Sequence, residues 1–177
     1  MTSTRDPYSA EALARMQALV EEMSEQTDRG VAIVGSAWVE EALHATLEAF
    51  LHPESKAWKR LFEGNGPLAT FSAKIDLLHV LGLISEIVRA DLHAIREVRN
   101  EFAHQIAHKI SHAKLGFGSQ HIQDKCLALK CVAHERLSDP REAFIRACAV
   151  LNADFEMVRM FGVKLPDAGQ VIASIER

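Results

Sequence analysis

Residues 84–106 read ISEIVRADLHAIREVRNEFAHQI, and this stretch decides the fold class. At the 100° step of an α-helix, its large apolar side chains fall within about 60° of Ile95. They are Ile84, Val88, Leu92, Ile95, Phe102 and Ile106. The stripe predicts one long amphipathic helix that opens at Ser85, runs to about residue 110 and packs its apolar face on a core.

The same helical period recurs along the chain, and clustered Gly and Pro residues separate the segments. No segment alternates in the manner of a strand, and no internal repeat is visible. The other expected helices cover residues 9–27, 30–51, 68–81, 120–133, 140–161 and 167–176, and residues 55–63 form a short amphipathic piece. We therefore predict an all-α fold, a single-domain bundle of about five to seven helices. The expected parts are an N-terminal helix (1–24), a helical core (25–135) and C-terminal helices packing on that core (136–177).

The distribution of charge argues against DNA binding. The net charge is −4; residues 1–52 hold three Arg against nine Asp and Glu, and residues 53–177 hold 17 Lys and Arg against 15 Asp and Glu. Neither part has the basic excess of a non-specific DNA binder. A recognition helix needs several basic or amide side chains on one exposed face. The nearest candidate, 120–134, offers only Gln120, Gln123, Lys125 and Lys130, so we expect no specific binding of duplex DNA by the isolated chain.

Cysteine usage and hydropathy indicate the compartment. The chain has three cysteines, Cys126, Cys131 and Cys148, and no C-x-x-C motif. The odd number and the missing motif favour free thiols in a reducing compartment. The N-terminus has no apolar signal segment, and no run of 18 apolar residues occurs. We expect a cytoplasmic protein that is not inserted in a membrane.

Arg99 lies inside the apolar arc of the long helix, about 40° from Ile95. An unpaired charge at a buried position carries a large free-energy cost. We therefore predict that Arg99 is largely buried and ion-paired, with Asp76 of the preceding helix or Glu41 of the second helix. Such a pair would either tie two helices together or orient a functional site, and the sequence leaves both interpretations open.

The R-N-x-x-x-H spacing of Arg99, Asn100 and His104 resembles the motif of the HEPN superfamily. In ribonucleases of that superfamily, two protomers bring their motifs together at a dimer interface. The resemblance implies that Arg99 would stabilise phosphate charge and His104 would transfer protons beside Asn100, without a metal. Many such domains are not catalytic, and a structural or binding role of the three residues is the interpretation we favour.

Two E-x-x-H spacings, Glu41 to His44 and Glu101 to His104, raise the question of a metal site. In four-helix bundles, paired motifs of this kind hold di-iron centres when they project into the core. Glu101 and His104 lie opposite the apolar arc, so we predict no metal and no cofactor. His44 is expected to be a partly buried helix residue.

Several blocks of sequence, taken together, resemble the mannitol operon repressor family over about residues 25–135. The blocks are Asp28-Arg29-Gly30, Val39-Glu40-Glu41, GPLATFSAKID at 66–76, LGLI at 81–84 and IREVRNEFAH at 95–104. The resemblance implies an all-helical fold and a negative regulator of transcription linked to sugar-alcohol uptake. It also implies that Arg99, Asn100 and His104 are signature positions, to which we add Asp76 as a structural partner.

The function predicted from these observations is a repressor of this type that acts through protein–protein contact and forms a homodimer. It is not expected to be an enzyme. The alternative is a HEPN-type RNA-binding module or metal-independent ribonuclease. The two differ in the role of Arg99, Asn100 and His104, which are structural or binding residues in the first and catalytic residues in the second.

Overall fold

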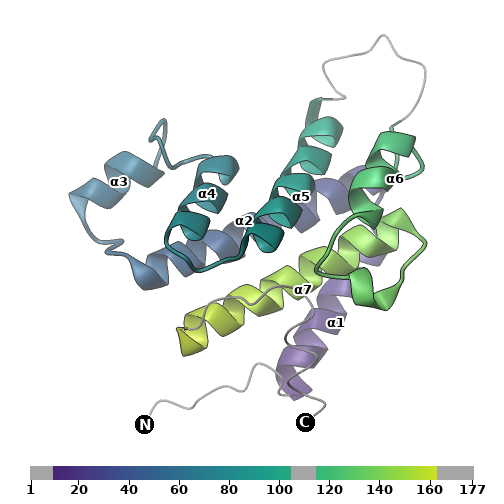
Figure 1. The fold of residues 1–177 in the computed structure, drawn as a ribbon, viewed down its shortest axis with the longest axis horizontal. Helices are drawn as coiled ribbons and strands as arrows, with labels where there is room; N and C mark the ends of the chain where they lie inside the picture. The colour runs from purple at the N-terminus through teal and green to yellow at the C-terminus, as the bar shows by residue number, and fades with distance from the viewer. Residues whose placement is uncertain (1–9, 105–114, 163–177) are drawn as a thin grey trace.

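The computed structural model describes residues 10–104 and 115–162. Within these ranges the chain is helical and contains no strand (Figure 1). Its α-helices are α1 (Ala10–Ser24), α2 (Asp28–Phe50), α3 (Lys56–Phe62), α4 (Phe71–Val80), α5 (Glu86–His104), α6 (Gln120–Leu127) and α7 (Pro140–Phe161), and η1 (Ala133–Glu135) is a 3-10 helix. The predicted all-α bundle is confirmed. The expected continuation of the long helix to about residue 110, and the expected helix over 167–176, lie outside the described residues.

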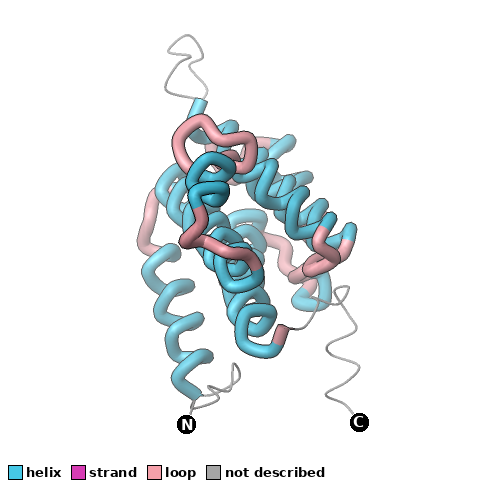
Figure 2. Tube along the Cα trace, turned by 90° about the vertical axis from the view of Figure 1, so that its left-hand side faces the viewer, coloured by secondary structure: helices cyan, strands magenta, loops and turns pink. Residues whose placement is uncertain are grey.

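Helices α2 and α7 lie along each other through the middle of the bundle (Figures 1 and 2). Helices α1 and α6 pack against α7, and α4 and α5 pack against α2 and against each other. Gly35 permits the close approach of α2, because a Cβ atom there would lie 3.1 Å from both Cys148 Sγ and Met23 Sδ. Gly35 and Ser36 are buried, whereas the neighbouring Ala37 is exposed.

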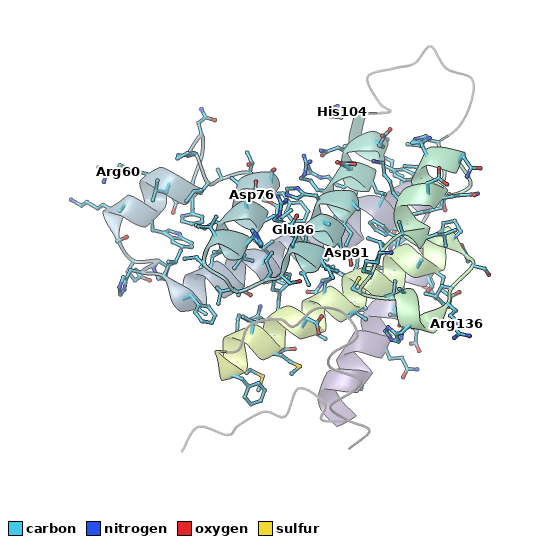
Figure 3. All side chains as sticks on the ribbon, in the orientation of Figure 1. Arg60, Asp76, Glu86, Asp91, His104 and Arg136 are labelled. Atoms are coloured by element: carbon cyan, nitrogen blue, oxygen red, sulfur yellow. The ribbon has the colours of Figure 1, made fainter. Side chains whose placement is uncertain are left out.

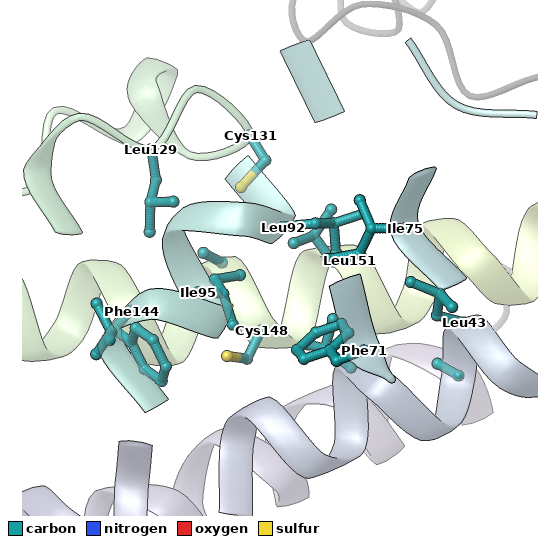
Figure 4. Packing of buried hydrophobic residues seen from close by; sticks show 14 of the residues in the cluster. Leu43, Phe71, Ile75, Leu92, Ile95, Leu129, Cys131, Phe144, Cys148 and Leu151 are labelled. Atoms are coloured by element: carbon teal, nitrogen blue, oxygen red, sulfur yellow. The ribbon is translucent and has the colours of Figure 1, made fainter. Parts of the chain in front are cut away.

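Fully buried side chains from four helices fill the centre of the bundle (Figure 4). They include Leu43 of α2, Ile75 of α4, Leu92 and Ile95 of α5, and Phe144, Cys148 and Leu151 of α7. Removing such apolar surface from water is the main force that holds the helices together. All three cysteines are buried free thiols, as predicted. Burial raises the pKa of Cys126 to about 12, so its thiol stays protonated at neutral pH.

Local capping residues set where the helices begin. The Asp139 side chain accepts a hydrogen bond from Arg141 N at 2.9 Å, and Pro140 occupies the first turn of α7. Helix α7 therefore begins at residue 140, where the expected helix over 140–161 begins. Ser85 likewise accepts from Val88 N at 3.2 Å, which places the start of α5 where the sequence expected it.

Helix α6 is shorter than the predicted helix over 120–133, because it ends at Leu127. The buried Asp91 carboxylate of α5 accepts hydrogen bonds from Lys130 N at 3.0 Å and Cys131 N at 2.7 Å. These two N–H groups therefore point toward α5, and helix α6 ends before Lys130 and Cys131. Burial raises the pKa of Asp91, and the two backbone hydrogen bonds oppose that rise.

Candidate functional site

The charged side chains of α5 form two rows along the helix. On the side of α6, Glu97 binds Lys125 Nζ, and Glu101 Oε2 lies 3.5 Å from His121 Nε2. The hydrogen bond from Lys125 holds the pKa of Glu97 below its ordinary value. This row is acidic on α5, where Lys125 of α6 compensates Glu97 and His121 of α6 lies beside Glu101.

The second row, which we call the basic row, comprises Arg89, His93, Arg96 and Asn100 with Arg99 beside them. Its members follow the spacing i, i+4, i+7 and i+11, which places them on one helical face. The row divides into a lower part near the start of α5, formed by Arg89 and His93, and an upper part toward its end, formed by Arg96, Arg99 and Asn100.

The lower part of the basic row is fully compensated by carboxylates (Figure 3). Asp76 Oδ1 of α4 lies 3.1 Å from both Arg89 Nη1 and His93 Nε2. Arg89 also binds Glu86 at 2.6 Å, and His79 Nε2 lies 3.4 Å from Glu86. Burial would raise the pKa of Asp76, but the hydrogen bonds from His93 and Arg89 outweigh it and lower that pKa.

The predicted ion pair of Arg99 with Asp76 or Glu41 is wrong. Arg99 is half-buried, and its Nη1 donates to Asn100 Oδ1 at 3.2 Å. Asp76 lies at the level of His93, which precedes Arg99 by about 9 Å along the helix axis at 1.5 Å per residue. Glu41 is exposed on α2. The helical wheel placed Arg99 near the core correctly, but it contained no information on which residue of α4 lies opposite.

His104 is exposed and is the last residue of α5, at the end of the helix labelled in Figure 3. Of the three motif residues, the structure therefore joins Arg99 to Asn100. Within the described ranges, His104 has no hydrogen bond to either of them. The catalytic arrangement of Arg99, Asn100 and His104 remains a prediction.

Arg96 is a further basic residue of the site that our sequence analysis did not single out. Its Nε atom is buried and has no hydrogen-bond partner among the described residues. The carboxylate that approaches it is Glu97, at 4.0 Å from Nη2, and Glu97 is already bound by Lys125. The spacing of Arg96 and Arg99, three residues apart on one helix, is the sequence signal that could have identified this pair.

Other residues of the quoted blocks hold the bundle together. Lys74, which is largely buried on α4, binds Glu40 of α2 at 3.0 Å. Asp28 accepts a hydrogen bond from Phe117 N at 3.1 Å, and its other carboxylate oxygen lies 3.3 Å from Arg141 Nε. These carboxylates therefore connect α2 to α4, to α7 and to the loop before α6.

An exposed apolar surface lies at the turn between α4 and α5. Val80 is 80% exposed, Leu81 43% and Ile87 37%, and we call these three residues the apolar corner. The exposed carboxylates of Asp76 and Glu86 lie on the same two helices. A cluster of exposed apolar side chains beside charged groups is typical of a protein-contact surface.

Within the described ranges, no group of three His, Cys, Asp or Glu residues is placed to hold a metal ion. His44 is half-buried, as predicted, and packs its ring against Trp58 at 5.4 Å and Phe62 at 6.1 Å. Among the same residues, none of the helices has the length and apolar composition needed to span a bilayer.

The fold is that of a solved all-helical protein. The chain resembles one in the X-ray structure of the MtlR-HPr complex from Escherichia coli, with a TM-score of 0.62 and 18% sequence identity. The likeness covers 80% of this chain and 98% of that chain. The profile of the family described as "Mannitol repressor" matches residues 16–157. The chain therefore belongs to the mannitol repressor family, as the sequence blocks suggested. Among curated proteins, none matches its sequence.

Proposed function

We propose that the chain is a negative regulator of transcription that acts by binding a protein partner of the HPr type. Membership of the mannitol repressor family supports the regulatory part of this proposal. The similar Escherichia coli structure is a complex with HPr, which supports a protein partner. The observation that carries the contact is the apolar corner, because it exposes Val80, Leu81 and Ile87 on well-packed helices.

The side chains of α6 support contact with a protein rather than direct reading of DNA. Gln120 Nε2 donates to Asp124 Oδ1 at 2.8 Å, and Gln123 Nε2 donates to Gly118 O at 3.0 Å. Lys125 is bound to Glu97 of α5. Three of the four side chains that would have to contact bases or phosphates are thus engaged within the chain, and Lys130 alone is left.

Calorimetric titration with HPr from the same organism tests the proposal. We expect saturable binding to the wild type and at least about 10-fold weaker binding to Val80→Asp, because a charge at a buried contact must be desolvated. Leu127→Asp is the matched control, since Leu127 is 46% exposed on α6, away from the apolar corner. Absence of HPr binding, or equal weakening by both variants, would contradict the proposal.

A gel-shift titration with duplex DNA from the operon's control region tests the DNA part. We expect no specific complex at physiological salt. A specific complex at the roughly 10⁻⁸ M level typical of repressors would overturn action through a protein partner alone.

Homodimerisation is also part of the proposal. The end of α7 exposes Met160 and Phe161, which a second copy would remove from water. Sedimentation equilibrium of the wild type and Phe161→Asp distinguishes the outcomes. We expect a dimer that dissociates in the variant, and a wild-type monomer at all concentrations would contradict it.

A further inference from the structure

The upper part of the basic row contains two guanidinium groups without a close carboxylate among the described residues. Arg96 has Glu97 at 4.0 Å as its nearest acidic contact and a buried Nε atom without a partner. Arg99 has the neutral Asn100 as its hydrogen-bond partner. Both arginines are half-buried, so their charges are held close to the protein surface and are only partly hydrated.

The acidic residues nearby are engaged elsewhere. Glu97 binds Lys125, and Glu101 lies beside His121 of α6. On α4 and at the start of α5, Asp76 is bound by Arg89 and His93. Glu40 of α2 is bound by Lys74. Among the described residues, Arg96 therefore has only the 4.0 Å contact with Glu97, which Lys125 already binds, and Arg99 has no carboxylate partner.

The groups that remain are hydrogen-bond donors. A guanidinium has five N–H donors and no acceptor. Asn100 Oδ1 accepts from Arg99, which leaves the Nδ2 amide of Asn100 to donate outward. A set of donors that carries positive charge is complementary to an oxyanion, and one guanidinium can bind both oxygens of a carboxylate through two parallel hydrogen bonds.

We propose that Arg96, Arg99 and Asn100 form a receptor for one carboxylate group of the protein partner. This inference rests on the proposed function and names the chemistry by which the partner is recognised. The receptor begins nine residues after Ile87 and ends 13 residues after it, which is roughly 14 to 20 Å along α5 from the apolar corner. The corner supplies apolar contact area, and the receptor fixes the orientation of the partner.

The surroundings favour a single carboxylate over the phosphate backbone of a nucleic acid. Asp76, Glu86, Glu97 and Glu101 all lie on α4 or α5 around the receptor, each with its side chain 43–63% exposed. A polyanion that followed the helix would meet these carboxylates, and the chain as a whole carries a net charge of −4. A single acidic side chain meets only the two arginines.

Titration of HPr into matched arginine variants tests the receptor. We expect Arg96→Gln and Arg99→Gln to weaken binding at least about 10-fold each, because each removes charge-assisted hydrogen bonds. Arg136→Gln is the control, since Arg136 is exposed in the loop after η1, far from α5 in Figure 3. Arg99→Lys keeps the charge but loses the paired N–H groups, and we expect an intermediate affinity.

Two further measurements identify the ligand chemistry. Wild-type affinity is expected to fall when sodium chloride rises from about 0.05 to about 0.3 M, and less so in Arg99→Gln. Among HPr variants in which single Asp or Glu residues become Lys, one is expected to restore binding to Arg99→Glu, as a directly coupled pair requires. Thermal melts of every variant confirm that it is folded.

The possible outcomes distinguish a failure of the receptor from a failure of the proposed function. If HPr binds the wild type and both Gln variants equally, the receptor is wrong and the proposed function stands. If HPr does not bind at all, the proposed function fails, and titration with a short peptide that carries a single glutamate still tests the receptor. If single-stranded RNA binds more tightly than that peptide and the Gln variants abolish it, the receptor binds phosphate and the carboxylate assignment is overturned.

Discussion

The lower and upper parts of the basic row on α5 contain similar residues, yet they differ in how closely carboxylates of the chain approach their positive charges. In the lower part, Asp76 of α4 compensates Arg89 and His93. In the upper part, Arg96 and Arg99 lack a close carboxylate among the described residues. The difference arises because α4 supplies its acidic side chain at the level of His93 and not higher. Charges that the fold compensates stabilise the bundle, and charges that it leaves uncompensated are available to a partner.

The largest expected effect on stability concerns the buried pair of Lys74 and Glu40. Glu40→Ala leaves the ammonium group of Lys74 largely buried without its carboxylate. Because Glu40 is partly exposed and water can reach the pair, we expect a loss of about 2–3 kcal/mol of unfolding free energy, at or below the low end for buried pairs. Urea unfolding measures it. Glu41→Ala, one residue along and exposed, is the control and should leave the midpoint unchanged.

A smaller effect is expected at Asp76, which is half-exposed. Asp76→Asn removes the compensation of Arg89 and His93, and with allowance for solvent screening we expect a loss of about 0.5 kcal/mol. The pKa of Asp76 is lowered in the folded protein, so its contribution is fully present above its ordinary pKa of about 3.9 and disappears as pH falls through the folded value. Melts of the wild type and the variant should therefore differ at neutral pH and converge in acid.

Arg99→Ala is expected to change the unfolding free energy by less than about 0.5 kcal/mol, the range of substitutions that break no buried pair. A buried ion pair, as the helical wheel suggested, would give a loss of about 3–5 kcal/mol instead. Urea unfolding beside Glu40→Ala in the same buffer makes the comparison direct. A loss as large as that of Glu40→Ala would show that the two parts of the basic row do not differ in compensation.

The last prediction is the absence of ribonuclease activity. We expect no cleavage of single-stranded RNA by the wild type, because the exposed carboxylates of Glu97 and Glu101 would repel a phosphate backbone and His104 is exposed at the helix end. The assay is run in a chelator, since the HEPN-type alternative needs no metal. Cleavage that falls about 100-fold or more in a folded His104→Ala variant, the scale of a lost acid or base, would make the ribonuclease alternative correct.

Much of the fold could be predicted because its signals are local. The apolar stripe of α5 and the Asp139-Pro140 start of α7 depend on neighbours within one or two turns, and both are where the sequence placed them. The end of α6 was missed because Asp91, almost 40 residues earlier, accepts the N–H groups of Lys130 and Cys131. A contact between residues so far apart in the sequence does not change the helical spacing of apolar residues, so this spacing could not predict where α6 ends.

The sequence by itself determined the helical class, the apolar face of each helix and, through its blocks, the family to which the chain belongs. It also placed Arg99 inside the apolar arc, and Asn100 one residue further on, outside that arc. Only the tertiary structure decided which carboxylate compensates which cation, since that depends on the level at which α4 packs against α5. His93 and Arg99, six residues apart on α5, differ in whether a carboxylate of α4 pairs with them. An ion pair requires contact within about 4 Å, whereas helical periodicity specifies only the direction of a side chain.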